Sequence, residues 1–371
     1  MAGLIKTGFT ELEGWAEEDH KAAFAAFRHS SSYLLQSPPT SREKSARAQD
    51  LLLIAQKAFD CSQDLNAQQA RCFFEDNFQP YQLQQHGLLT GYYQPQFEGR
   101  RTPDADFCHP LYKRPGDLIP ISSKQALAAG FTKETSFARE TEQGLAFHLS
   151  RSEIMAGGLD GLGLELVWLK DPLDVYIIHI QGSARIVLED ETILRVAFDG
   201  KSGHPYQSLG KILIKKGIFS ADTITMDGLM AYIKALGDAG SKLLAENPSY
   251  IFFKQVQSDG NKLVQDPDQG PVAAAGIPLV AMRSMAVDRH RHTFGLPFWL
   301  QTNLPSGENE QTPFNQLVFA HDTGSAITGA ARGDLFVGTG AQAGQLAGRL
   351  QQQTAFFCLM PIKRTENAEG S

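Results

Sequence analysis

Apolar side chains recur at intervals of three and four residues along the N-terminal part of the chain, the period of a helix with one buried face. Two such runs, Trp15–Leu35 and Ser41–Phe59, are separated by the helix-breaking sequence Ser37-Pro38-Pro39. A third run follows from Asn66 to Phe74. The pattern predicts a helical lead-in over residues 1–80.

From residue 87 onward the apolar runs become short, β-branched or aromatic, and are separated by glycine and proline, which is typical of strands and turns. We predict strands at Gly87–Pro95, Leu164–Leu169, Val175–Ile180, Ile186–Leu188, Ile193–Phe198, Tyr250–Phe253, Ile277–Met285, Phe298–Leu300, Leu317–His321, Asp334–Val337 and Thr354–Leu359. Two helices are predicted among them, at Tyr206–Lys216 and Met226–Ala245. Many short strands separated by turns rich in glycine and proline indicate a mainly β protein, either a barrel or a sandwich, with flanking helices. Strands from both ends of the chain, with a mixed segment between them, suggest an inserted domain.

Composition narrows the class of protein. A chain of 371 residues corresponds to about two domains of ~150 residues each, or to one large domain. The content of 42% hydrophobic and 20% charged residues excludes a wholly disordered chain. The net charge of −7 and the lack of a basic run argue against nucleic acid as a partner. No uncharged apolar run approaches the ~20 residues of a membrane helix. The four cysteines do not have the spacing of a metal site. A disulfide between Cys61 and Cys72 is one alternative, and two free thiols are the other.

The sequence Asp322-Thr323-Gly324-Ser325 follows a predicted strand and has the form of an aspartic peptidase motif. In those enzymes two carboxylates share a proton and activate a water molecule. The mechanism needs a second aspartate, and the chain has no second motif of this form. An aspartic peptidase is therefore the weaker interpretation, and a hydrogen-bonding role of Asp322 in a turn is the alternative.

Asp334 lies between a glycine and the apolar pair Leu335-Phe336 at the start of a predicted strand. In a cleft with apolar walls, desolvation would raise the pKa of this carboxyl group, as a general acid requires. Arg332 is two residues away and therefore on the same face of the strand, where its charge would favour the ionised form. The alternative is an ordinary surface aspartate.

Two further patterns suggest a cofactor or a metal, but neither is specific. Gly338, Gly340 and Gly344 have the spacing GxGxxxG, and too few residues follow them for a dinucleotide-binding βαβ unit. A strand-to-helix turn explains these glycines better. His290 and His292 form an HxH pair without a third ligand nearby. We therefore predict neither a cofactor nor a metal.

Six segments, taken together and in order, resemble the membrane-bound lytic murein transglycosylase A (MltA) family. They are Thr90–Pro95, Ile180–Ala184, Gly200–Lys211, Asn247–Phe253, Ser284–Arg289 and Asp322–Gly340. The similarity covers residues 85–360. It implies a six-stranded double-ψ β-barrel domain formed by residues 1–105 and 250–371, including the helical lead-in. It also implies an inserted β-rich domain at residues 106–249 and a substrate groove between the two.

The resemblance implies non-hydrolytic cleavage of the β-1,4 bond between N-acetylmuramic acid and N-acetylglucosamine in peptidoglycan, with formation of a 1,6-anhydromuramoyl end. Because the C6 hydroxyl of the sugar itself attacks C1, the nucleophile is tethered and one carboxylate is enough. The catalytic acid of the family matches Asp334, which would protonate the glycosidic oxygen and then accept the O6 proton. Asp288 and Asp322 match the two other aspartates of the C-terminal part, and would orient loops or substrate or adjust the pKa of Asp334.

A glycan strand needs aromatic faces and polar groups, and the matched segments supply both. The candidate binding residues are Thr90, Tyr92, Tyr93, Gln181, Gly182 and Ser183. Each has a structural alternative, in the barrel core for the tyrosines and in a turn for the glutamine and serine.

The resemblance also predicts partners and location. They are peptidoglycan glycan strands, a monomer associated peripherally with the outer membrane or cell-wall machinery, and the periplasm or cell envelope. The first six residues show neither an export signal nor a cysteine for lipid attachment, so the location rests on the resemblance. A non-catalytic glycan-binding barrel remains a second hypothesis.

Overall fold

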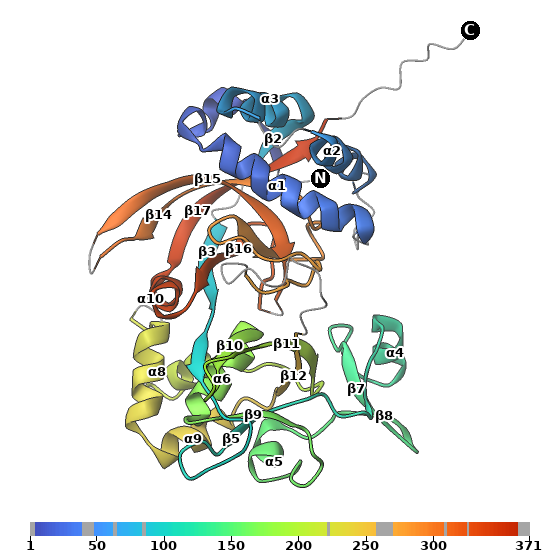
Figure 1. Ribbon diagram of the computed structural model, residues 1–371, viewed down its shortest axis with the longest axis vertical. Coiled ribbons are helices and arrows are strands. Elements are labelled where there is room, and N and C mark those ends of the chain that lie inside the picture. The colour runs from blue at the N-terminus through green and yellow to red at the C-terminus, as the bar shows by residue number, and fades with distance from the viewer. Residues whose placement is uncertain are drawn as a thin grey trace. The chain divides into compact units, whose positions relative to one another are not determined.

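The computed structural model describes residues 4–38, 48–61, 65–83, 87–220, 223–256, 270–307, 310–324 and 326–362 (Figure 1). Its contacts divide the chain into two compact units. Unit 1 comprises Met1–Tyr93, Pro267–Gly338 and Arg349–Ser371, and unit 2 comprises Gln94–Asp266 and Thr339–Gly348. The domain boundaries given above stay a prediction. None of the helices described here combines the length and hydropathy of a membrane-crossing segment.

Six of the described strands close a barrel, most of it in unit 1. They are β3 (Gly87–Gln94), β13 (Ser284–Val287), β14 (Pro297–Pro305), β15 (Gln311–Asp322), β16 (Arg332–Thr339) and β17 (Gln351–Pro361). Their order is β17-β14-β15-β13-β16-β3, and β3 pairs again with β17. The pair β13–β15 is parallel, whereas β13–β16, β14–β15, β14–β17 and β17–β3 are antiparallel. β1 (Leu4–Lys6) and β2 (Phe78–Leu83) extend the sheet from β17.

Three helices of unit 1, α1 (His20–Gln36), α2 (Ala48–Asp60) and α3 (Ala67–Asn77), cover one side of the barrel (Figure 1). The 3-10 turns η1 (Phe9–Glu11) and η2 (Trp15–Glu17) precede them. α1 begins five residues later than predicted, because Asp19 caps it by accepting a hydrogen bond from the Ala22 N–H. Buried aromatic side chains of the helices and the barrel form one core, which includes Trp15, Phe27, Phe74, Trp299 and Phe319. The predicted helix start at Ser41 lies outside the described residues.

The described residues of unit 2 form three smaller sheets and several short helices. Its four-stranded sheet has the order β12-β11-β10-β4, formed by β4 (Gln96–Glu98), β10 (Ser183–Val187), β11 (Ile193–Lys201) and β12 (Ile251–Gln255). The other sheets are β5 (His109–Tyr112) with β9 (Glu165–Leu169), and β6 (Leu118–Pro120) with β7 (Phe137–Thr141) and β8 (Gly144–Ala146). The helices are α4 (Ser123–Ala128), α5 (Arg151–Met155), α6 (Pro172–Gln181), α7 (Leu209–Lys215), α8 (Met226–Ala235), α9 (Asp238–Leu244) and most of α10 (Ala341–Arg349).

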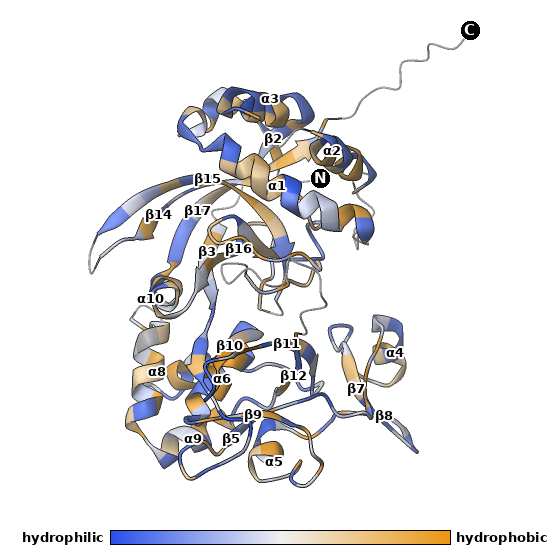
Figure 2. Cartoon of the chain, viewed as in Figure 1, coloured by the Kyte–Doolittle hydropathy of each residue, from blue (hydrophilic) through white to orange (hydrophobic). Residues whose placement is uncertain are grey.

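The predicted strand Val175–Ile180 is wrong, because these residues belong to α6. Asp171 caps the helix through the Leu173 N–H, at 2.9 Å, and Pro172 occupies its first turn. Gly182, with a left-handed φ of 75°, ends it. The helix is apolar around most of its circumference (Figure 2), so its sequence lacks the polar face that distinguishes a helix from a buried strand.

Two other predicted elements are too long. Met226–Ala245 forms two helices, since Gly237, with a φ of 54°, separates α8 from α9. In Ile277–Met285 only the end is a strand, because Met282 adopts a left-handed turn with a φ of 61° before β13 begins. Each remaining predicted strand overlaps a strand of the structure, although several of those strands are longer than predicted. Cys61 and Cys72 are not bridged.

Candidate active site

Three adjacent strands of the barrel bring Asp322 and Asp334 to one face of the sheet. Ala286 of β13 lies opposite Asp334 of β16 and also opposite Asp322 of β15. Residues paired directly across a ladder point their side chains to the same face. The two carboxylates therefore flank the small, buried side chain of Ala286, one on each neighbouring strand.

A β-bulge sets this register. Met285 is paired with Ala320 and Ala286 with Asp322, so His321 is the extra residue of β15. In a regular ladder Ala286 would face His321, and Asp322 would point to the other face of the sheet. His321 is instead fully buried, with its Nδ1 2.8 Å from the Ser284 hydroxyl.

Two side chains orient the carboxyl group of Asp334. The Thr90 hydroxyl of β3 donates a hydrogen bond to Asp334 Oδ1. Arg332 Nη2 donates in turn to Thr90 Oγ1, at 2.8 Å. Because arginine can only donate, the hydrogen of the Thr90 hydroxyl is directed to Asp334. Oδ2 of Asp334 has no hydrogen-bond partner within the described residues, so this oxygen can carry and transfer a proton.

Burial raises the pKa of Asp334 to about 6. The hydrogen bond from Thr90 and the charge of Arg332 oppose this rise, and the negative charge of Asp322 adds to it. A carboxyl group with this pKa exists in both forms near neutral pH. That property suits a group that first gives a proton and then takes one back.

Asp322 has a different environment, because three donors hold its carboxylate. The Tyr92 hydroxyl donates to Oδ2 at 2.9 Å, and the backbone N–H groups of Ala274 and Thr323 donate to Oδ1 at 3.0 and 2.9 Å. Burial raises the pKa of Asp322, and these three hydrogen bonds act in the opposite direction. Burial, followed by the charge of Asp322, holds the pKa of Tyr92 well above its ordinary value, so Tyr92 stays a phenol. Asp322 is thus an acceptor that fixes Tyr92.

Asp288 follows β13 and is almost completely buried. Its Oδ1 accepts a hydrogen bond from the His290 N–H, and its Oδ2 accepts one from the Gly329 N–H, both at 2.8 Å. The Thr323 hydroxyl donates to the Val287 carbonyl at 2.9 Å beside this pair. Asp288 therefore positions the segment that leads from Asp322 to Asp334.

Known proteins resemble this chain in sequence and in structure. The family model of the MltA specific insert domain matches residues 88–254, and that of the 3D domain matches residues 283–360. The structure is similar to the crystal structure of membrane-bound lytic murein transglycosylase from Agrobacterium tumefaciens, with 34% identity and a TM-score of 0.87. That similarity covers 97% of this chain and 98% of the other. The chain belongs to the MltA family.

Two further relatives extend the comparison. The crystal structure of MltA from Neisseria gonorrhoeae is 28% identical with a TM-score of 0.74, and the similarity covers 98% of this chain and 93% of that one. Membrane-bound lytic murein transglycosylase A of Vibrio cholerae is 31% identical over 265 residues, or 70% of this chain. The match spans 62% of the length of that relative. The MltA structures and the closed barrel confirm the predicted mainly β, double-ψ barrel fold.

The structure brings some predicted site residues together and places others elsewhere. Thr90 and Tyr92 contact the two aspartates, whereas Tyr93 is half-buried at the alternate position of β3. In unit 2, Gln181 is the last residue of α6, Gly182 caps the helix with a left-handed φ of 75°, and the buried Ser183 begins β10. Each of the three thus has a local structural role. Their contact with glycan stays a prediction.

The aspartic peptidase hypothesis requires two carboxyl groups that share a proton. Asp322 and Asp334 do face the same side of the barrel, although the second aspartate belongs to no Asp-Thr-Gly motif. Within the described residues, however, no hydrogen bond joins the two carboxyl groups, and each has its own donors. Ser325 of the motif lies outside the described residues. The geometry favours one proton-transferring carboxyl group over a shared pair.

Some parts of the site depend on strand pairing and are not evident in the sequence. Ala286 lies in one of the six segments that resemble the family. Its small side chain is the only feature of the sequence that could indicate its place between the two aspartates. The sequence indicates Arg332 only as a charge beside Asp334, whereas in the structure it also donates a hydrogen bond to Thr90 of β3. The prediction that the glycines after Val337 form a strand-to-helix turn is confirmed, because Gly340, with a φ of 86°, lies between β16 and α10. Within the described residues, no group of three or more histidine, cysteine, aspartate or glutamate side chains is arranged to hold a metal ion.

Proposed function

We propose that this protein is a lytic transglycosylase that cleaves the β-1,4 bond between N-acetylmuramic acid and N-acetylglucosamine in peptidoglycan and forms 1,6-anhydromuramic acid. The single observation that carries the proposal is the contrast between two neighbouring carboxyl groups. Asp334 has a pKa of about 6, and its Oδ2 has no hydrogen-bond partner within the described residues, whereas three donors engage Asp322. Hydrolysis by the usual glycosidase mechanism would need two carboxyl groups available for chemistry.

In this reaction Asp334 Oδ2 donates its proton to the glycosidic oxygen while the bond from C1 to that oxygen breaks. The C6 hydroxyl of the muramic acid attacks C1, and its proton passes to Asp334. One C–O bond breaks and one forms, and no water is consumed. The nucleophile belongs to the same sugar ring, so its approach carries little entropic cost. Thr90 fixes which oxygen of Asp334 performs the transfer.

The other aspartates have positioning roles. Asp322 holds the Tyr92 hydroxyl, and Asp288 holds the backbone at Gly329. We assign glycan contacts to Thr90, Tyr92, Tyr93, Gln181, Gly182 and Ser183. The partner is the glycan strand of peptidoglycan, and a location in the cell envelope follows from the relatives named membrane-bound. A monomeric state is part of the same proposal.

Digestion of purified sacculi tests the reaction. The wild-type protein is expected to release muropeptides whose ends are lighter by one water than hydrolysed ends. Asp334→Asn should abolish the product, while Asp76→Asn, at an exposed aspartate of α3, should not affect it. Reducing N-acetylmuramic acid as the sole end would indicate a hydrolase. Binding to sacculi without soluble product would favour the non-catalytic glycan-binding hypothesis.

A further inference from the structure

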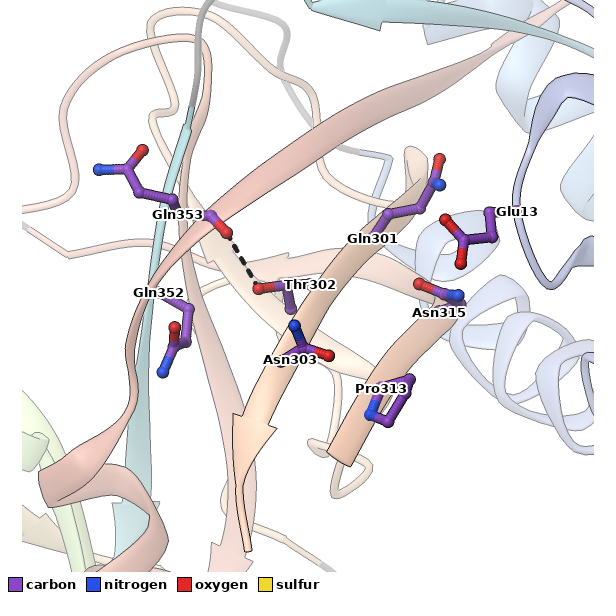
Figure 3. Close-up of a pocket in the computed structure, with 8 residues that line it drawn as sticks. All are labelled: Glu13, Gln301, Thr302, Asn303, Pro313, Asn315, Gln352 and Gln353. Atoms are coloured by element: carbon purple, nitrogen blue, oxygen red, sulfur yellow. Dashed lines mark hydrogen bonds between the residues drawn. The ribbon is translucent and has the colours of Figure 1, made fainter. Parts of the chain in front are cut away.

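A polar pocket lies in unit 1 where the pairing of β14 with β17 ends (Figure 3). β17 pairs with β14 over Phe298–Gln301 and with β3 over Gln351–Thr354. β14 continues beyond Gln301 in its ladder with β15. The pocket between these strands has a volume of about 340 Å³. The Thr302 hydroxyl crosses it to donate to the Gln353 carbonyl at 3.1 Å.

One face of the β14–β15 hairpin supplies most of the polar lining. Gln301 lies opposite Asn315, and Asn303 lies opposite Pro313, so these four side chains share a face. Leu304, at the alternate position, is buried on the other face. The alternation therefore presents a row of carboxamides to the pocket.

Glu13 adds the one charged group of the lining. Trp15, two residues later, packs against Trp299 with ring centroids 5.1 Å apart, which anchors this segment on the barrel. Gly14 has a φ of 78°, and a Cβ atom at this position would lie 2.9 Å from Asn315 Cβ. Only glycine permits this approach without strain, and it places Glu13 next to the carboxamide row (Figure 3).

The carboxamides keep hydrogen-bonding capacity that the protein does not use. Within the described residues, the side chains of Asn303, Asn315 and Gln352 make no hydrogen bond to another residue, and Gln301 Oε1 is shielded from solvent without a partner. A buried acceptor without a partner destabilises the protein. A ligand that brings both donors and acceptors would use this capacity.

We propose that this pocket is a second glycan site, which binds an acetamido sugar of the strand outside the reaction site. Carboxamides both donate and accept, as sugar hydroxyls do, and the Glu13 carboxylate accepts from hydroxyl groups. The lining contains no lysine or arginine, so it offers no counter-charge to an anionic ligand. Small-molecule sites span ~300–1,000 Å³, and this pocket lies at the end of that range suited to one or two sugar rings. The choice of a glycan rests on the proposed function.

The pocket shares no lining residue with the Asp334 cluster. β17 lies between them, with Gln351 paired to Thr90 and Gln352 paired to Leu89. A sugar held here would keep a long strand on the barrel between cleavage events. Binding in the pocket would therefore increase activity on polymeric glycan. It would not affect the cleavage of a fragment too short to reach the pocket.

Binding measurements in the Asp334→Asn protein test the site without turnover. Titration with N,N′,N″-triacetylchitotriose, followed by calorimetry and by the side-chain amide signals in NMR, is expected to reveal a site whose signals include Asn303 and Asn315. Asn303→Ala and Glu13→Gln, both at exposed positions, should each weaken that site about 10-fold, the effect of one lost hydrogen bond. Gln36→Ala, at an exposed glutamine of α1, is the matched control and should leave it unchanged.

Unchanged affinity in both pocket variants, with an unchanged response of the Asn315 amide signal to the sugar, would overturn the second site. A response to the uncharged peptide N-acetyl-trialanine amide, but not to the sugar, would replace the glycan by a peptide. The proposed function fails separately. If wild-type protein forms no anhydro ends although the pocket variants lose sugar binding, the pocket stands and the transglycosylase does not. If anhydro ends form and the variants bind as before, only the pocket fails.

Discussion

The hydroxyl of Thr90 donates a hydrogen bond to Asp334 Oδ1, although the two residues are 244 positions apart in the sequence. Arg332 fixes the direction of this bond by donating to the same hydroxyl. The site therefore contains an oriented chain of donors that ends on the carboxyl group assigned to proton transfer. Its geometry determines which oxygen of Asp334 holds the proton.

Thr90→Val should change both the rate and its pH dependence. The hydrogen bond from Thr90 favours the ionised form of Asp334, so its removal raises the pKa of that carboxyl group further. We expect kcat to fall about 10- to 100-fold through loss of orientation, and the pH–rate profile to move toward higher pH. Thr90→Ser keeps the hydroxyl and should restore both. A Val variant with the wild-type profile would contradict the orienting role.

Ala286→Leu should impair the site through its volume. The side chain of Ala286 lies between two carboxylate-bearing strands and is buried, so extra methyl groups must displace Asp322 or Asp334. Overpacking of this kind costs about 1–3 kcal/mol. We expect a lower melting temperature and a loss of muropeptide release. Ala286→Ser, which adds one atom, should retain more of both, and equal activity of the Leu variant would argue against the spacing role.

Tyr92→Phe removes one of three donors to Asp322. The Ala274 and Thr323 N–H groups remain, so the fold should persist with a loss of about 1 kcal/mol in the free energy of unfolding. Because the side chain at position 92 then no longer has a hydrogen bond to Asp322 that holds it in place, we expect activity on sacculi to fall about 10-fold. Tyr81→Phe, at a half-buried tyrosine of β2, is the control. Denaturant unfolding and muropeptide release measure the two effects.

The raised pKa of Asp334 predicts how stability depends on pH. The folded state holds the proton up to about pH 6, whereas the unfolded chain releases it near the ordinary value of 3.8. The proton therefore favours folding at low pH, and this contribution is lost as the pH rises from 3.8 through about 6. Asp334→Asn cannot ionise, so its melting temperature relative to wild type should be higher at pH 8 than at pH 4. The same difference at both pH values, measured beside Asp76→Asn, would contradict the shift.

Local signals made much of the fold predictable. Asn66 and Gln69 form a capping box at the start of α3, so this helix begins where the sequence indicates. Ser208 caps α7, which begins at Leu209, three residues after the predicted start at Tyr206. The short strands were found because apolar residues and turn residues alternate over a few positions. The error at α6 has the same origin, since an apolar run of that length fits either element until its surroundings are known.

The neighbours Leu335 and Phe336 make Asp334 a candidate for desolvation, and the resemblance to the MltA family selects it from the alternative of a surface aspartate. The same resemblance names Thr90 and Asp322, but their contacts could not be predicted, since Thr90 comes from β3 and Asp322 enters the site only through the bulge at His321.

The sequence by itself determined the family, through six ordered segments, and the type of most elements, although not of α6. It also made Asp334 the candidate for proton transfer, which stays a prediction. The tertiary structure decided the register of β13 against β15 and β16, the donors on each aspartate, and the pocket where β14 leaves β17. The physical reason is one of range. Caps, turns and hydrophobic periods act over a few residues, whereas a register or a shared hydrogen bond is fixed only when distant strands pack together.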